Sequence, residues 1–194
     1  MSATPLRLAV INSSVREGRF GPTVARWFVA QTEQREDLEV DLIDLADHML
    51  PHELSHSPGD DVAAQLARVS PRLAAAEAFV VVTPEYNHSF PASLKSLIDW
   101  HRTEWQAKPV GFVSYGGLAG GLRSVEHLRP VFAELHAVTV RDCVSFHNVW
   151  GQFDGSGALL EPTAAASAAK TLLDQLVWWG VSLREAREKR PYTA

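Results

Sequence analysis

Short apolar segments alternate with longer amphipathic ones along this chain, and this alternation constrains the fold more than any other feature. Several of the short segments are nearly continuous in apolar residues, as is typical of strands that are covered on both faces. Strands that alternate with helices form a parallel sheet, so the sequence predicts an α/β fold. We expect five strands, at Leu6–Asn12, Leu38–Ile43, Ala78–Thr83, Pro109–Ser114 and Val138–Ser145.

Segments with helical spacing lie between and after these strands. The first begins at Pro22, because proline favours the first position of a helix, and Val24, Ala25, Phe28 and Val29 follow on one face. A chain of 194 residues fits one such domain, so we expect residues 1–194 to form a single domain. The other helices are expected at about Val62–Ala76, Pro91–Glu104, Leu122–Leu135 and Pro162–Arg187.

Composition and charge exclude several classes of partner. The formal net charge is -5 and the basic residues are dispersed, which argues against a nucleic-acid or membrane surface and favours small molecules. Near the N-terminus the longest apolar run, Leu8–Ile11, is too short for a signal or membrane segment, so we expect a cytoplasmic protein. The lone cysteine, Cys143, lies in an expected strand and is interpreted as a buried thiol.

Three loops carry unusual residues, and each follows a strand whose carboxyl end would border the ligand crevice of a parallel sheet. The first, Ser13–Gly21, joins a strand to a helix N-terminus and contains two hydroxyls, Arg16 and Arg19. Unpaired helix N–H groups and guanidinium donors favour phosphate binding. The alternative is a solvated turn.

The other two loops are typical of contacts with a flat ligand. The segment Thr83–Pro91 contains two prolines, which restrict its backbone, together with an aromatic ring and an amide side chain. The segment Ser114–Gly121 contains four glycines, which allow the backbone to approach a ligand closely. A structural turn and a flexible connection, respectively, are the alternatives.

The sequence does not match the common motifs for nucleotide binding or for a serine nucleophile, and it does not support a zinc site. Gly116 and Gly121 have P-loop spacing, but Leu122 and Arg123 occupy the positions that need Lys and Ser or Thr; neither GxGxxG nor GxSxG occurs. Three histidines recur at a spacing of four residues and would share a helical face, which could hold zinc. Pro51 interrupts such a helix, so we expect no metal site and interpret His48, His52 and His56 as part of a polar surface loop.

Read together, the three loops resemble the NADPH-dependent FMN reductase family over most of the chain from Leu6 to about Leu135. The resemblance implies a flavodoxin-like three-layer sandwich with sheet order 2-1-3-4-5, bound FMN, and a homodimer or homotetramer. The matching residues are Ser14-x-Arg16-x-x-Arg19, Pro84-Glu85-Tyr86-Asn87-x-Ser89-x-Pro91-x-x-Leu94-Lys95-x-x-x-Asp99-Trp100 and Ser114-x-Gly116-Gly117-x-x-Gly120-Gly121.

Residue by residue, the resemblance implies eleven cofactor contacts. Ser14, Arg16 and Arg19, with Phe20 alongside, match the positions that bind the FMN phosphate. Pro84, Glu85, Tyr86 and Asn87 match the segment along the isoalloxazine ring, and Tyr115, Gly116 and Gly117 match the segment on its other side. The chain departs from the family at Ser13, where glycine is usual, although this serine can still donate to phosphate.

The resemblance implies a reductase in which NADPH, or NADH, passes a hydride to FMN, which then reduces a free flavin, a quinone or a similar small acceptor. No catalytic side chain is required, because FMN supplies the chemistry. Arg123 and His88 are candidates for holding the nicotinamide cofactor. A flavodoxin-type carrier without enzyme activity is the alternative, and tryptophans such as Trp100, Trp105, Trp178 and Trp179 are candidates for a subunit interface or for the core.

Overall fold

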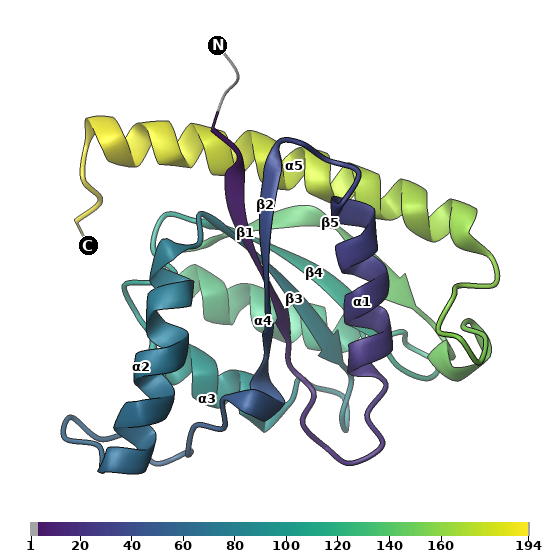
Figure 1. Ribbon diagram of the computed structural model, residues 1–194, viewed down its shortest axis with the longest axis horizontal. Helices are drawn as coiled ribbons and strands as arrows, with labels where there is room; N and C mark the ends of the chain where they lie inside the picture. Colours follow the sequence, from purple (N-terminus) through teal and green to yellow (C-terminus); the bar gives the residue numbers. More distant parts are fainter. Residues whose placement is uncertain (1–3, 194) are drawn as a thin grey trace.

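Five parallel strands form the centre of the computed structural model, which describes residues 4–193 (Figure 1). The sheet order is β2-β1-β3-β4-β5, and each neighbouring pair is parallel, which confirms the expected flavodoxin-like topology. The strands are β1 (Leu6–Asn12), β2 (Leu38–Asp44), β3 (Ala78–Pro84), β4 (Pro109–Tyr115) and β5 (Val138–Phe146).

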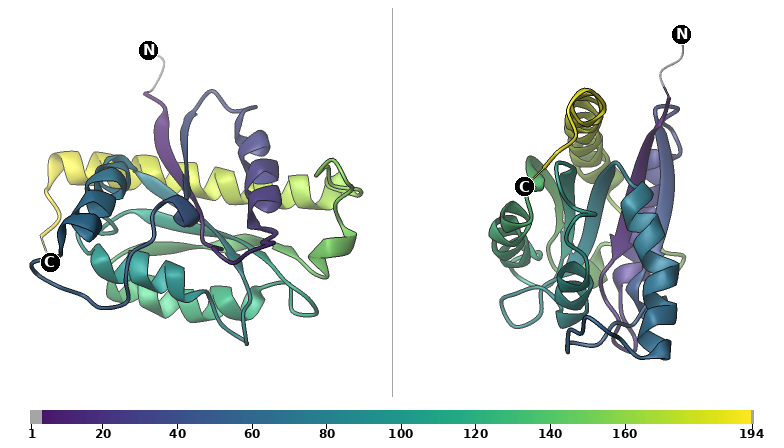
Figure 2. Two further views of the ribbon diagram at one scale, coloured as in Figure 1. Left: turned by 60° about the horizontal axis from the view of Figure 1, so that its bottom comes forward. Right: turned by 90° about the vertical axis from the view of Figure 1, so that its left-hand side faces the viewer.

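Helices cover both faces of the sheet (Figures 1 and 2). Helices α1 (Gly21–Thr32) and α5 (Pro162–Lys189) bury their apolar sides on one face. Helices α2 (Asp60–Ala75), α3 (Ala92–Trp100) and α4 (Leu122–Glu134) do so on the other. Two short 3-10 turns follow β2 and β5, η1 at Leu45–Asp47 and η2 at Val149–Gly151.

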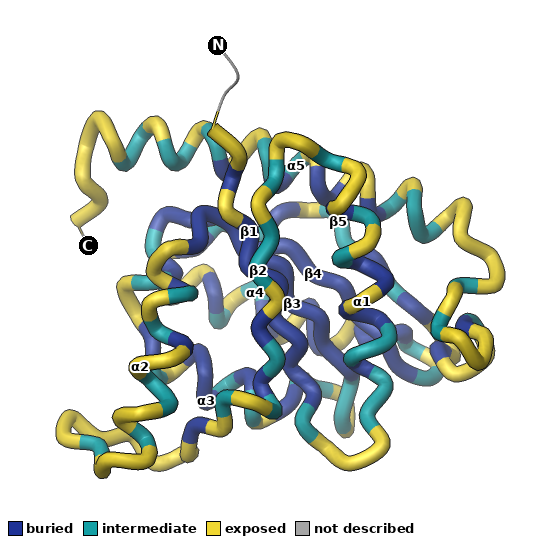
Figure 3. Tube along the Cα trace, viewed as in Figure 1, coloured by how far each residue is buried: buried dark blue, intermediate teal, exposed yellow. Residues whose placement is uncertain are grey.

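Burial explains why these segments are strands. Every residue of β3 and β4 is buried, as their continuous apolar sequence requires of strands inside a three-layer structure. The edge strand β2 is half-buried over most of its length and carries charged residues such as Glu39 and Asp41. Figure 3 shows the buried interior strands and the exposed chain between η1 and α2.

Helix α3 ends at Trp100 rather than continuing to Glu104 as expected. His101 has an extended backbone (φ -129°, ψ 131°), which turns the chain back toward the sheet. This turn buries the Trp105 indole against Phe79 and Phe132, with ring centroids 4.7 and 5.5 Å away. The indole Nε1 donates to the His101 carbonyl at 2.8 Å, so burial of this ring overrides local helix propensity.

The four tryptophans named from the sequence fall into two groups. Trp105 is fully buried in the core of its own chain, and Trp100 is half-buried with its Nε1 donating to the Pro51 carbonyl. Neither therefore offers a free aromatic surface. Trp178 and Trp179 of α5 are 63% and 37% exposed.

Two other sequence expectations are refined. Cys143 is half-buried rather than fully buried, and burial raises the pKa of its thiol. The chain between η1 and α2 is not helical, so the three histidines do not share a face; His48 contacts Arg72 and His52 contacts Ser96. None of the helices in residues 4–193 combines the length and apolar character that a membrane crossing needs.

We predict that Trp105→Phe lowers the free energy of unfolding by about 2 kcal/mol, because it opens a cavity and leaves the His101 carbonyl without its donor. Denaturant unfolding measures this change. The matched control, Trp178→Phe, removes a mainly exposed indole and should shift stability by less than about 0.5 kcal/mol. Equal losses in the two variants would contradict this account of the core.

Candidate functional site

The three loops singled out in the sequence meet at the carboxyl edge of the sheet. In the strand register Asn12 pairs with both Asp44 and Val82, and Pro84 pairs with Tyr115. β1 and β2 therefore end level with each other, and β3 and β4 end level with each other two residues further along. Helix α1 begins at the same edge, so its N-terminus faces the loops that follow β1 and β3.

The phosphate loop, as we name residues 13–21, directs both serine hydroxyls inward. Ser13 Oγ donates to the Val82 carbonyl at 2.9 Å and Ser14 Oγ donates to Asn12 Oδ1 at 3.2 Å, and both residues are fully buried. Among the described residues, no hydrogen bond joins the backbone N–H groups of residues 15–18 to a protein acceptor. The backbone donors of residues 15–18 are therefore not used by the protein, while the serines attach the loop to the end of the sheet. The Ser13 proton is used in that attachment.

Arg19 is held in place by Asp44, a residue that the sequence analysis did not identify. Arg19 Nη1 donates to the Ser14 carbonyl at 2.6 Å and to Asp44 Oδ1 at 2.5 Å. The Asp44 carboxylate also accepts from Asn12 Nδ2 and Ala46 N, each at 3.0 Å. Burial alone would raise the pKa of Asp44, but these hydrogen bonds hold it below its usual range, and the Asp44 bond raises the pKa of Arg19.

Arg16 lies against the next loop. Its guanidinium carbon is 5.6 Å from the centroid of the Tyr86 ring, and the Arg16 side chain is otherwise exposed. Burial raises the pKa of the Tyr86 phenol, an effect that Arg16 and Arg19 partly offset. The guanidinium of Arg16 therefore lies over the aromatic ring and remains available to an anion.

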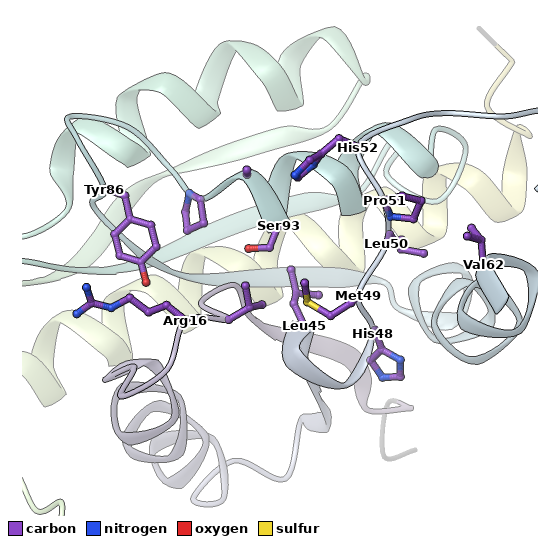
Figure 4. A pocket seen from close by; sticks show the side chains of 13 residues that line it. Arg16, Leu45, His48, Met49, Leu50, Pro51, His52, Val62, Tyr86 and Ser93 are labelled. Carbon is purple, nitrogen blue, oxygen red and sulfur yellow. The ribbon is translucent and has the colours of Figure 1, made fainter.

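A cleft of about 600 Å³ begins at this pair (Figure 4). Tyr86 and Arg16 lie at one end, and His48 and Val62 lie at the other. Its walls are mainly apolar, with Leu45, Met49, Leu50 and Pro51 supplied by the segment that follows β2. From the sequence this segment was expected to be a polar surface loop, but its apolar side chains form a wall of the cleft, and His48 and His52 line it as well.

The loop after β3 is a tight turn whose tip is exposed. Tyr86 and Ser89 exchange two backbone hydrogen bonds, and Asn87 and His88 between them have φ of 49° and 72°. Asparagine tolerates this left-handed conformation, which accounts for its place in the loop. Asn87 is exposed at the tip of this turn.

Of the two residues considered for the nicotinamide cofactor, His88 belongs to this turn and Arg123 lies at the start of α4. Arg123 Nη1 donates to the nearly buried Glu85 carboxylate at 2.9 Å, so this arginine already has a protein partner. His88 lies beside His127, with ring centroids 6.0 Å apart. Neither of these side chains lines the cleft.

The loop after β4 is fixed by its neighbours. Gly116 N donates to the Phe146 carbonyl, and the carbonyls of Gly116 and Gly117 accept from Val149 and Asn148. Tyr115 at the end of β4 is only 4% exposed, and its side chain extends to the phosphate loop, where Gly21 and Ser14 lie beside the hydroxyl.

Phe20 secures the other end of the phosphate loop. Its ring packs edge-on against Phe153, with centroids 5.5 Å apart and an interplanar angle of 66°. Since Phe153 lies after η2, this contact joins the start of α1 to the segment that follows β5. The residues predicted from the sequence are therefore gathered at one edge, around a loop with two cationic side chains and free backbone donors. This arrangement is typical of a phosphate-binding α/β protein.

Comparison with known proteins identifies the family. A model of the NADPH-dependent FMN reductase family matches residues 6–151. The NAD(P)H-dependent FMN reductase of Schizosaccharomyces pombe is 37% identical over 128 residues, which cover 62% of this chain and 62% of that protein. A probable NADPH:quinone oxidoreductase of Oryza sativa is 30% identical over 169 residues, covering 83% and 82% of the two chains.

A solved structure shows the same fold. FerB of Paracoccus denitrificans, a flavoenzyme NAD(P)H:acceptor oxidoreductase, has a TM-score of 0.69 over 91% of this chain and 98% of its own, at 23% identity. The chain therefore belongs to the NADPH-dependent FMN reductase family. It is an oxidoreductase that works with FMN and a nicotinamide cofactor.

We predict that Asp44→Asn destabilises the protein by about 1 kcal/mol at pH 7, because the ionised carboxylate holds Arg19. The pKa of Asp44 is lower in the folded state than in the unfolded state, so this stabilisation is present above about pH 4 and lost as the pH falls through the lowered value. Unfolding curves at several pH values should show the gap between variant and wild type narrowing as the pH falls below about 4.

Asp99→Asn is the control, because Asp99 forms an exposed pair with Lys95 four residues earlier on α3. Such pairs contribute less than about 0.5 kcal/mol. A gap for Asp44→Asn that stays constant from neutral to acid pH would contradict a role for its charge.

Proposed function

We propose that the phosphate loop holds the phosphate end of FMN at the start of α1. One observation supports this proposal. Arg16, the anchored Arg19 and the unbonded backbone N–H groups of residues 15–18 all belong to the loop that leads into α1. Opposite charge and a helix N-terminus together favour a phosphate dianion. Ser14 and Phe20 support the loop from below through the contacts described above.

We propose that the ring of FMN lies between the loops after β3 and β4. Pro84, Glu85, Tyr86 and Asn87 would border one side, and Tyr115, Gly116 and Gly117 the other. The rigid hydrogen bonding of both loops supports this placement, because it supplies a preformed edge for a flat heterocycle. FMN, when bound there, accepts a hydride from the nicotinamide cofactor and passes two electrons to an acceptor. The protein residues bind, orient and limit access; none is required to transfer a proton.

The acceptor is proposed to be a small, largely apolar molecule such as a quinone or a free flavin. The cleft beside Arg16 and Tyr86 supports this proposal, because its apolar walls would favour a planar ring while Arg16 would attract a polar edge. A rice relative is named as an NADPH:quinone oxidoreductase, which agrees with this substrate class. Donor and acceptor would react in turn, in a ping-pong sequence.

We also propose the domain organisation, the oligomeric state and the location of the protein. The chain acts as one domain, supported by α5, which returns from the far end of the sequence onto the sheet. The protein forms a homodimer or homotetramer, supported by the exposed Trp178 and Trp179, and light scattering should give at least twice the 21.3 kDa of one chain. We propose that the protein is cytoplasmic, where the nicotinamide cofactor would be available to it.

We predict that NADPH or NADH bleaches the flavin absorbance of the FMN-loaded protein under anaerobic conditions, and that added quinone restores it. The family and its named relatives favour this reductase activity over the carrier alternative. Stopped-flow absorbance measures both half-reactions. A flavin that neither NADPH nor NADH reduces, although dithionite does, would contradict the reductase and favour a carrier.

We predict that Arg16→Ala weakens FMN binding about ten-fold to a hundred-fold, because a hydrogen bond to a charged group contributes roughly 1.5 to 3 kcal/mol. Riboflavin, which lacks the phosphate, should bind the variant almost as well as the wild type. Fluorescence-quenching titrations give both affinities.

Arg26→Ala is the matched control, because Arg26 is an exposed arginine further along α1. It should leave both affinities unchanged. Equal loss of FMN and riboflavin in Arg16→Ala, or loss of neither, would show that Arg16 does not hold the phosphate.

A further inference from the structure

Tyr115 combines a buried ring with an unpaired hydroxyl. The residue is 4% exposed and its ring packs in the core beneath α1 and α5. Among the described residues, the hydroxyl oxygen has no hydrogen-bond partner. A buried donor without an acceptor destabilises the folded state, and such groups are uncommon in native proteins. The hydroxyl therefore requires an explanation beyond packing.

The surroundings of this hydroxyl belong to the phosphate loop. Ser14 Oγ and Asn12 Oδ1 lie nearby; the Ser14 proton is donated to Asn12, so Ser14 can meet the phenol only as an acceptor, and the geometry of that contact is not that of a hydrogen bond. Gly21, the first residue of α1, leaves room for the cluster: a Cβ there would lie 2.7 Å from the Tyr115 oxygen and would collide with the Ser14 and Asn12 oxygens. The absence of a side chain at position 21 thus lets these three oxygens converge directly under the helix N-terminus.

We propose that the Tyr115 hydroxyl donates a hydrogen bond to a phosphate oxygen of the cofactor at the N-terminus of α1. Tyr115 is then a phosphate ligand, rather than only a neighbour of the isoalloxazine ring as the family resemblance implies. This inference rests on the proposed function, because it requires FMN phosphate at the phosphate loop. Burial raises the pKa of the phenol above its usual value, so the group stays protonated and can donate at all working pH values.

The variant Tyr115→Phe tests this assignment, because it keeps the ring and removes only the hydroxyl. FMN affinity should fall about ten-fold to a hundred-fold, whereas riboflavin affinity should stay within about two-fold of wild type. The free protein should be as stable as wild type or more stable, since an unsatisfied buried group has been removed. Inorganic phosphate, the second probe, should raise the thermal midpoint of the free wild type more than that of the variant.

Tyr192→Phe is the matched control, because Tyr192 is an exposed tyrosine near the C-terminus whose hydroxyl bonds to His136. It should change neither flavin affinity nor the response to phosphate. Equal loss of FMN and riboflavin affinity in Tyr115→Phe would overturn the assignment, and so would a less stable free protein, which would mean that the hydroxyl is already paired. If the wild type binds neither FMN nor phosphate, the proposed function itself fails, which is a separate result.

Discussion

The parallel pairing of β1 with both β2 and β3 determines where the functional groups of this protein lie. Because β1 and β2 end at paired residues, Asp44 at the end of β2 reaches the loop that follows β1 and binds Arg19. The loop after β3 reaches the same place and brings Tyr86 against Arg16. Buried apolar strands therefore position a polar site at their carboxyl ends.

Buried and exposed side chains have different roles around the phosphate loop. The internal hydrogen bonds of Ser13 and Ser14 hold its backbone, and the ion pair with Asp44 holds the Arg19 guanidinium in place. Arg16 is exposed and rests on an aromatic face, so it can adjust to a ligand. Because Arg19 is already anchored, it loses little conformational entropy when a ligand binds. The exposed Arg16 can add a contact once the phosphate is present.

Much of this arrangement was predictable from the sequence. Apolar runs located all five strands to within one residue at each end, and the family resemblance implied the sheet order. The early end of α3 was not predictable, because it depends on burial of Trp105 against rings from distant segments. Asp44 and the position of the Tyr115 hydroxyl were missed for the same reason: each depends on a partner that only the folded register supplies. The one available signal for Asp44 was its place after an apolar strand, at the ligand edge.

The central claim is that the phosphate loop binds a flavin that ends in a monophosphate. Mass spectrometry of the cofactor released from the purified protein tests it most directly, because FMN and FAD differ in the pyrophosphate and adenosine that the loop would have to accommodate. The released cofactor is expected to be FMN, at about one molecule per chain. Recovery of FAD alone, or of no flavin after incubation with FMN, would contradict it.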